Sequence, residues 1–326
     1  MFSYEEINDE WSEYCVKKLL ELCLNWWYIS RNPNITSKIV KENPDKPWNY
    51  YMLSKNKNIT WEIVQQNSDK PWSYRELSIN PNITWDIVEA NPDKPWNYIA
   101  LSLNPNITWD IVEANPDKLY NYSCLSFNPN ITWEIVEANP DKPWSYRELS
   151  INPNITWEIV EANPNKPWDY DILSLNRNIT WEIIKANPDK PWNYSCLSKN
   201  LNITWEIVCK NPDKPWDYRT LSKNPNITCK IVEANPDKHW NYLKLIENPN
   251  ITFEYIKKNM GNNYYIPYGL MSNEFTLEKE MFFRNKLQEW FKKSDLKKEL
   301  IEKLWHPKNY EKFKYYDPEM FLEEDE

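Results

Sequence analysis

Short groups of apolar residues recur along the chain between polar turns, and the spacing between the groups is constant. Residues 152–168 read NPNITWEIVEANPNKPW, and near-copies of this stretch run through most of the sequence. A period without insertions is typical of a solenoid, because each unit must occupy an equivalent position in the stack. The core motif Asn-x-Asn-Ile-Thr begins every 24 residues, at Asn32, Asn56, Asn80, Asn104, Asn128, Asn152, Asn176, Asn200, Asn224 and Asn248.

Each unit contains two similar stretches that predict the starts of two helices. The same six-residue pattern occurs at 152–157 and again at 163–168: Asn-Pro, then Asn or Asp, a variable residue, Thr or Pro, and Trp. Asn, Asp and Thr side chains accept hydrogen bonds from the free N–H groups of a first turn, and proline is tolerated there. The Asn-Pro pairs end the preceding helix, so helices of about 6 to 10 residues are expected. The proline-rich spacing leaves no alternating run long enough for a strand.

The two helix starts can be assigned within one unit. With Thr60 as the N-cap of the first helix, Ile59 and Val64 have the spacing of a hydrophobic staple. The second helix is expected to be capped by Asp69 or Lys70, with the proline that follows in its first turn.

Tryptophan dominates the predicted core. Burying one Trp contributes on the order of 4–6 kcal/mol, whereas ordering each residue of a unit costs roughly 1–2 kcal/mol in backbone entropy, so a single unit cannot fold alone. We therefore predict an all-α fold, an αα solenoid of about ten two-helix repeats with a nearly continuous ladder of buried Trp, extended into a rod or superhelix of roughly 100 Å. The predicted core residues are Trp61, Trp72, Trp85, Trp96, Trp109, Trp133, Trp144, Trp157, Trp168, Trp181, Trp192, Trp205 and Trp216.

The two ends of the chain depart from the repeat. Residues 1–24 contain the amphipathic stretch EEINDEWSEYCVKKLLELCL, which predicts an N-terminal capping helix. Residues 25–261 form the predicted solenoid. From about Asn262 the period fails, and residues 262–326 predict a C-terminal cap of two or three helices that ends in an acidic tail. Caps of this kind shield the end faces of a solenoid.

Composition narrows the classes of function. The formal net charge is −9, and because affinity for nucleic acid depends largely on cations, a general role in binding DNA or RNA is disfavoured. No apolar run approaches the length of a membrane span, and Met1–Tyr4 is followed by acidic residues. We expect a soluble, unsecreted protein without a membrane role. The six cysteines lack a Cys-x-x-Cys pair, which fits reduced thiols.

Candidate chemistry is sparse. The chain has two glycines and two histidines, His239 and His306; His306 lies beside a predicted helix end and is assigned a packing or capping role. Asn-Ile-Thr is formally a glycosylation sequon, but its Asn and Thr also suit turns and caps. A row of amides that binds ligands or peptide backbones is the less favoured alternative. Acidic residues after the first-helix Trp, such as Glu62 and Glu158, suit the helix dipole. We expect no catalytic residue, metal site or cofactor, and no enzymatic activity.

The positions at which the copies differ carry the functional prediction. The residue between Leu-Ser and the next Asn is apolar in five central units and charged in the units on either side. If this column faces solvent, it forms an apolar strip about 40 Å long that marks a protein partner; if it faces the layer beneath, it is ordinary core. The candidate protein-binding residues are Ile79, Leu103, Phe127, Ile151 and Leu175, with Arg75, Arg147 and Arg219 in the neighbouring variable pair.

A longer duplication tempers this interpretation. RELSI occurs at 75–79 and at 147–151, and SCLS at 123–126 and at 195–198. Both pairs are separated by three units, which indicates that three units were copied together. Similar residues at these positions therefore record duplication as readily as selection for a ligand.

The repeated phrase NPNIT-WEIV-x2-NPDKPW-xY-x2-LS, over about residues 25–261, resembles tandem 24-residue helical repeat proteins of mimivirus-like giant DNA viruses of amoebae. The abundance of Asn, Lys, Ile and Tyr suits such an AT-rich genome. The resemblance implies a viral protein that acts in the host cytoplasm or in the virion. It brings no activity that can be assigned to particular residues.

Three functions follow from these observations. The favoured one is a non-enzymatic repeat scaffold that binds an unknown host or viral protein through one face. The second is a structural component of the virion or virus factory that self-associates through aromatic surfaces. The third, disfavoured by the acidic charge, is a modular nucleic-acid-binding solenoid that uses the regularly spaced arginines.

Overall fold

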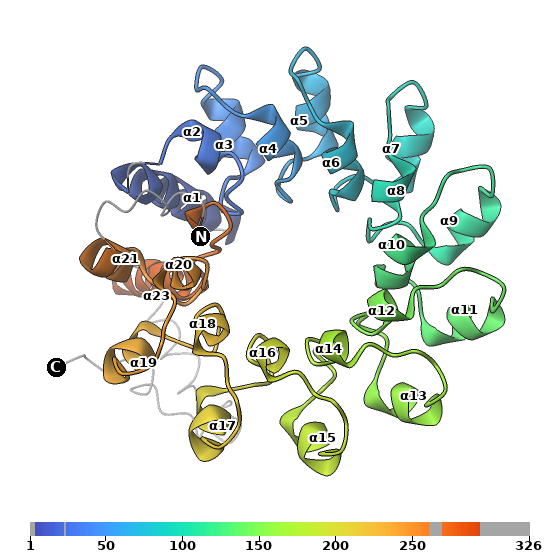
Figure 1. Ribbon diagram of the computed structural model, residues 1–326. Coiled ribbons are helices and arrows are strands. Elements are labelled where there is room, and N and C mark those ends of the chain that lie inside the picture. The colour runs from blue at the N-terminus through green and yellow to red at the C-terminus, as the bar shows by residue number, and fades with distance from the viewer. Residues whose placement is uncertain (1–3, 23, 261–268, 294–326) are drawn as a thin grey trace, which may run out of the picture.

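The computed structural model describes residues 4–22, 24–260 and 269–293, and within these ranges the secondary structure is helical throughout. The predicted αα solenoid is confirmed. Each 24-residue unit contributes one helix to an outer row and one to an inner row of a curved stack (Figure 1). The outer helices are α3 (Ser37–Glu42), α5 (Trp61–Gln66), α7 (Trp85–Ala90), α9 (Trp109–Ala114), α11 (Trp133–Ala138), α13 (Trp157–Ala162), α15 (Trp181–Ala186), α17 (Trp205–Lys210), α19 (Cys229–Ala234) and α21 (Phe253–Met260).

The inner row begins after the short helix α2 (Trp26–Ile29). Its members are only four to six residues long. They are α4 (Tyr50–Ser54), α6 (Tyr74–Ile79), α8 (Tyr98–Leu101), α10 (Tyr122–Phe127), α12 (Tyr146–Leu149), α14 (Tyr170–Leu173), α16 (Tyr194–Leu197), α18 (Tyr218–Leu221) and α20 (Tyr242–Leu245).

The outer helices begin where the sequence predicts. Thr60 is the N-cap of α5, with an extended backbone, and the equivalent threonine caps the other outer helices of the repeats. Thr84 Oγ1 accepts a hydrogen bond from Ile87 N at 3.4 Å, which satisfies one free N–H of the first turn. Ile59 and Val64 are both buried, as a hydrophobic staple requires.

The predicted start of the second helix is wrong. Helix α6 is capped by Ser73, whose side chain accepts from Glu76 N, so Asp69, Lys70 and the proline after them precede the helix. These residues form a turn in which Lys70 N donates to Asn67 O at 3.0 Å. Proline disfavours the helical conformation of the residue before it, so a helix capped by Asp69 would be strained at its first residue, Lys70.

Trios of rings replace the expected continuous tryptophan ladder. Trp96 lies 5.5 Å from Trp61 of the preceding unit and 5.2 Å from Tyr74, measured between ring centroids. Its Nε1 donates to Asn91 O at 2.9 Å. The same trio recurs around Trp144, Trp168, Trp192, Trp216 and Trp240. Every one of the thirteen predicted core tryptophans is buried or half-buried.

Buried asparagines join consecutive units. Asn152 Nδ2 contacts the carbonyl oxygens of Asn128 and Ile131 in the preceding unit, at 3.0 and 3.3 Å, and that of Ser126, two residues before that unit, at 2.9 Å. Its Oδ1 accepts from Asn154 N at 2.9 Å. The amide of Asn154, the sequon residue, also donates to the preceding unit. The repeated Asn therefore bonds peptide backbone, but from inside the stack and not from its surface.

The repeated Ser of Leu-Ser makes a second link between units. Ser126 Oγ donates to Tyr122 O at 2.7 Å and accepts from Ser145 N of the next unit at 2.9 Å. This hydroxyl is buried, and the arrangement recurs from Ser30 to Ser222. Side-chain polar groups thus supply the hydrogen bonds that helices of four to six residues cannot supply themselves.

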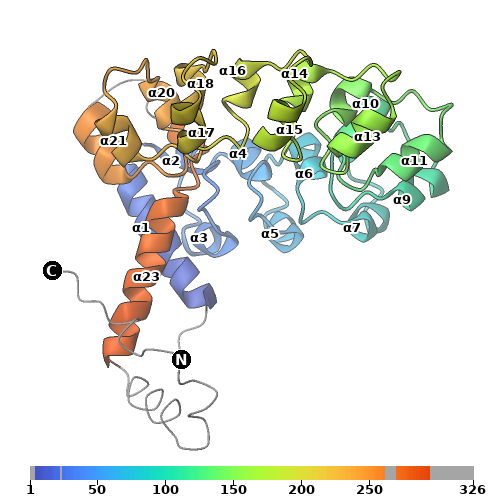
Figure 2. The same ribbon diagram turned by 90° about the horizontal axis from the view of Figure 1, so that it is seen from below.

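The stack closes into a ring, so the expected open rod or superhelix is wrong. In Figure 1 the rows curve until α21 and α23 (Thr276–Lys293) lie beside α1 (Tyr4–Glu21). Figure 2 shows α1 and α23 leaving the ring together on one side, and the two helices are in contact. The expected N-terminal capping helix is α1. Of the expected C-terminal cap, only 269–293 falls within the described residues.

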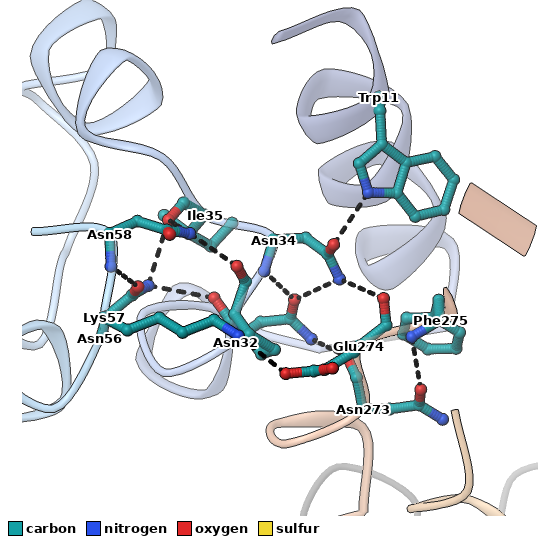
Figure 3. Close-up of polar contacts among 11 residues, drawn as sticks. Trp11, Asn32, Asn34, Ile35, Asn56, Lys57, Asn58, Asn273, Glu274 and Phe275 are labelled. Carbon is teal, nitrogen blue, oxygen red and sulfur yellow. Dashed lines mark hydrogen bonds and ion pairs between the residues drawn. The ribbon is translucent and has the colours of Figure 1, made fainter. Parts of the chain in front are cut away.

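Asn273 completes the row of asparagines across the junction between the two ends (Figure 3). Its Nδ2 donates to Ile246 O at 2.6 Å and to Asn248 O at 3.0 Å. Asn32 Nδ2 in turn donates to Leu270 O at 2.7 Å and contacts Asn273 O at 3.3 Å. The row therefore runs from Asn248 through Asn273 to Asn32 and onward, as a closed circle. Although the period fails near 262, residues 269–276 return to the geometry of a repeat.

The closing unit departs from the repeat by one residue. Asn273-Glu274-Phe275-Thr276 stands where a repeat has Asn-x-Asn-Ile-Thr. Phe275 is buried and has φ 50°, and among the described non-glycine residues it alone has positive φ. Such a backbone is unfavourable for a bulky side chain, so surrounding contacts must hold it. Phe275 stacks on Phe253 with a centroid separation of 4.0 Å.

Aromatic packing and polar contacts hold the junction together. Trp11 is fully buried, and its ring centroid lies 5.6 Å from that of Phe282. Its Nε1 donates to Asn34 Oδ1 at 2.8 Å. A Cβ at Gly269 would lie 2.6 Å from Ile246 Cγ2, so any other residue here would force Ile246 to shift. Ile246 stands where the other units have the linking serine, and the polar link is replaced here by apolar contact.

A half-buried carboxylate lies in the same junction. Glu278 Oε2 accepts from Phe253 N at 2.7 Å. Burial raises the pKa of Glu278 above its ordinary value, although the bond from Phe253 N opposes the rise. Because the folded state binds this proton more tightly, the carboxyl stabilises the fold fully below the ordinary glutamate pKa. That contribution is lost as pH rises through the raised pKa.

We expect Glu278→Gln to remove this pH dependence. The unfolding free energies of wild type and variant should be measured in urea between pH 4 and pH 8. As pH rises, the wild type should lose stability relative to the variant. Glu280→Gln, an exposed change in the same helix, is the control. A constant difference across this range would contradict the assignment.

Tyr120 offers a test of the ring trios, because it stands where the other units place Trp and its buried hydroxyl has no hydrogen-bond partner. Tyr120→Trp should raise the unfolding free energy by about 1–3 kcal/mol, since a new indole N–H would reach Asn115 O as Trp144 reaches Asn139 O. Tyr120→Phe, which only removes the unpaired hydroxyl, should give a smaller gain. A Trp variant less stable than wild type in urea would refute this account.

Ring closure should depend on Asn273 and Trp11. Because this pair joins the two ends, Asn273→Ala combined with Trp11→Ser should open the ring and increase the radius of gyration measured by small-angle X-ray scattering. Asn152→Ala combined with Trp157→Ser removes the same kinds of group within the array, so it should lower stability without opening the ring. Equal radii for the two folded double variants would count against closure through this junction.

Candidate interaction surface

The inner helices carry two exposed columns of variable residues. The first column is the residue after each inner-helix Tyr. The second lies four residues further on, within α6 and α10 and just beyond the C-terminal end of the other inner helices. We call them the first and second inner columns. The first contains Tyr51, Arg75, Ile99, Ser123, Arg147, Asp171, Ser195, Arg219 and Leu243, and the second contains Lys55, Ile79, Leu103, Phe127, Ile151, Leu175, Lys199, Lys223 and Glu247.

The structure places the five predicted apolar strip residues in the second inner column, where none of them is buried. Phe127 is 46% exposed and Ile79 is 36% exposed. Leu103, Ile151 and Leu175 are half-buried. Of the two alternatives open from the sequence, this column faces solvent to differing extents and is not core.

Three exposed apolar residues of the first inner column were missed by the sequence analysis, and one of them, Leu243 on α20, is 42% exposed and stands apart from the other two. Tyr51 is 45% exposed and Ile99 is 53% exposed, and both lie in the first inner column. The available signal was their position, because they occupy the variable site that holds Arg75 in the unit between them. Tyr51, Ile79, Ile99 and Phe127 lie on the consecutive inner helices α4, α6, α8 and α10, and we call this set the apolar arc (Figure 1).

The three predicted arginines are exposed in the first inner column. Arg147 Nη1 lies 3.8 Å from Asp169 Oδ2, a long contact for a side chain that is 68% exposed. Within the described ranges Arg75 and Arg219 form no ion pair. The neighbouring carboxylates are already engaged, since Glu76 Oε1 lies 3.3 Å from Tyr51 Oη and 3.6 Å from Lys55 Nζ.

The inner columns change character beyond α12. From α14 onward the first column is mostly polar, and Ser195 Oγ donates to Asp217 Oδ2 at 2.9 Å. In the second column Lys223 Nζ lies 2.6 Å from Glu247 Oε2. The apolar arc is therefore confined to the N-terminal half of the ring.

Other candidate chemistry does not converge on these columns. Burial raises the pKa of the Cys124 thiol, and likewise that of Cys196, so both are less readily ionised than free cysteine. Among the described residues no three His, Cys, Asp or Glu side chains are grouped as metal ligands would be. No helix within that part of the chain is long and apolar enough to cross a membrane. His306 lies outside the described residues.

The row of acidic residues after the first-helix Trp lies on the exposed side of the outer helices. A hydrogen bond with Thr132 lowers the pKa of Glu134, and one with Thr156 lowers that of Glu158. These contacts are within the first helical turn, as the capping interpretation expects.

The chain matches no protein-family model, no curated protein sequence and no solved structure.

The exposure of the second column can be tested through stability. Phe127→Glu should change the unfolding free energy by no more than about 1 kcal/mol, because the side chain is largely in water. Leu125→Glu, two residues away and fully buried, should prevent cooperative folding, because it buries an unpaired charge. Circular dichroism during urea unfolding distinguishes the two; similar losses would show that Phe127 belongs to the core.

Proposed function

We propose that this protein is a non-enzymatic, ring-shaped scaffold that binds another protein through its inner columns. The supporting observation is a separation of roles within the unit. The positions that make hydrogen bonds between units or fill the core, such as Asn152, Ser126 and Trp157, repeat almost without change. The inner columns are the positions that vary, and they hold a group of exposed apolar side chains, the kind of surface that marks an interaction site.

The apolar arc favours protein over nucleic acid as the partner. Exposed apolar and aromatic side chains beside arginine are typical of the centre of protein interfaces. Nucleic acid would need several cations along one path, whereas the inner columns hold no cation between Arg75 and Arg147, and the chain carries a net charge of −9. The resemblance to giant-virus repeat proteins extends the proposal to a partner in an infected amoeba, in the host cytoplasm or the virion.

Quantitative affinity capture tests the proposal. Immobilised wild-type protein should retain a defined set of proteins from a lysate of infected amoebae, and Ile99→Glu combined with Phe127→Glu should lose it, because charges replace the apolar contacts. Leu201→Glu is the matched control, since Leu201 is 59% exposed but lies outside both inner columns. Retention of the same proteins by the folded double variant would overturn the proposal.

The alternative function is self-association, in which another copy of this chain is the partner. If the apolar arc is covered by another copy of the chain, wild-type protein should sediment as an oligomer and the Ile99→Glu, Phe127→Glu double variant as a monomer. That result would favour a structural component of the virion or virus factory over a scaffold for other proteins.

A further inference from the structure

Two residues of the apolar arc, Ile99 and Phe127, lie between two arginines along the inner row. In chain order along the inner row, α6 carries Arg75, α8 carries Ile99, α10 carries Phe127 and α12 carries Arg147. Along this row α4 with α6, α6 with α8, and α10 with α12 are in direct contact, and α8 and α10 are neighbours in the row (Figure 1). The four side chains are exposed on successive members of one row. They form a surface with an apolar middle and a guanidinium group at each end.

The carboxylates next to the two arginines are not free to neutralise them. Glu76 is held by Tyr51 and Lys55 and is only 16% exposed. Glu148 accepts from Ser145 Oγ. Arg75 has no ion pair within the described ranges, and the contact between Arg147 and Asp169 is long. Two guanidinium groups therefore remain available to a partner, in a chain that is acidic as a whole.

We propose that the inner row binds an extended segment of a partner protein that has a short apolar run with a carboxylate at each end. The apolar run covers Ile99 and Phe127, and the carboxylates pair with Arg75 and Arg147. Guanidinium groups bind carboxylates with two parallel hydrogen bonds, which makes this charge pattern selective. The proposal rests on the proposed function and adds the chemistry of the partner.

The length of the segment follows from the packing of the helices. Three steps of about 8–10 Å separate α6 from α12, which gives roughly 24–30 Å along the row. An extended chain rises about 3.3 Å per residue, so about seven to nine residues span that distance. The two carboxylates should therefore be about eight positions apart, with the apolar residues between them.

Three fluorescein-labelled nonapeptides test this chemistry by fluorescence anisotropy at low salt. The first has Glu at positions 1 and 9, Leu at 3 and 7, Phe at 5 and Ser elsewhere; the second has Lys in place of Glu, and the third has Ser. Wild-type protein should bind the Glu peptide about tenfold more tightly than the Lys peptide, with the Ser peptide between them. Added salt should reduce this preference, because the ion pairs are accessible to solvent.

Charge reversal at the two arginines supplies the decisive comparison. Arg75→Glu combined with Arg147→Glu should reverse the order of the Glu and Lys peptides. Arg177→Glu changes an exposed arginine outside the inner columns and should leave the order as in wild type. Circular dichroism confirms that each variant is folded.

Several results would overturn the proposal. Equal binding of the three peptides, preference for the Lys peptide, or no binding at millimolar peptide would each do so. A single-stranded oligonucleotide that binds wild type and is lost on charge reversal would identify nucleic acid as the ligand instead. If the peptides fail while Ile99→Glu with Phe127→Glu still abolishes capture of a protein from lysate, the proposed function stands and only the partner's chemistry is wrong.

Discussion

The buried asparagine amide between consecutive units is the interaction on which this fold depends. Helices of four to six residues leave most of their backbone N–H and C=O groups without partners inside the helix. Burying one of those groups unpaired would cost about 1–3 kcal/mol. Asn152 and its equivalents satisfy carbonyl groups of the preceding unit, and Ser126 and its equivalents satisfy an amide of the next. The geometry of these bonds is nearly the same from unit to unit, which explains why the period tolerates no insertion.

Ring closure follows from repeating one geometry. When every junction imposes the same small rotation, the stack curves steadily, and its two ends meet when the rotations sum to a full turn. Asn273 then donates to Asn248 O of the last repeat, and Asn32 donates to Leu270 O in the segment of Asn273, as neighbouring units do elsewhere. The helices that would cap an open solenoid, α1 and α23, pack on one another instead. The one-residue difference in the closing unit is accommodated by the positive φ of Phe275.

The sequence predicts the parts of this structure that are encoded locally. The period, the two helices of each unit and the threonine caps of the outer helices all depend on residues within a few positions of each other. Closure depends on contacts such as that between Asn32 and Leu270, 238 residues apart, and on a sum of rotations that no single unit displays. The start of the inner helix was mispredicted because Pro71 could be assigned equally to a first turn or to the turn before it. Asn273, three residues before Thr276, was the available sign of a closing unit, but its shortened motif concealed the likeness.

The candidate surface divides in the same way. The sequence shows that the positions of Ile79 and Phe127 vary between units. It does not show whether these side chains face solvent or the layer beneath, because either orientation is compatible with the repeat. Ile99 and Tyr51 became visible as part of the same surface only when the inner columns were seen to be exposed. The separation of a constant scaffold from variable exposed columns is therefore a joint result of sequence and structure.

Zero-length carbodiimide cross-linking with mass spectrometry tests ring closure most directly. Lys57 Nζ lies 2.8 Å from Glu274 Oε1, 217 residues away, and Lys286 Nζ lies 2.5 Å from Glu10 Oε2. A closed ring predicts both cross-links within monomeric protein, alongside the link between Lys41 and Glu62 of adjacent units, 2.9 Å apart, which reports that the reaction has worked. Two results would contradict closure of the ring. One is the Lys41–Glu62 link without either long-range link, and the other is long-range links that form only between differently isotope-labelled molecules.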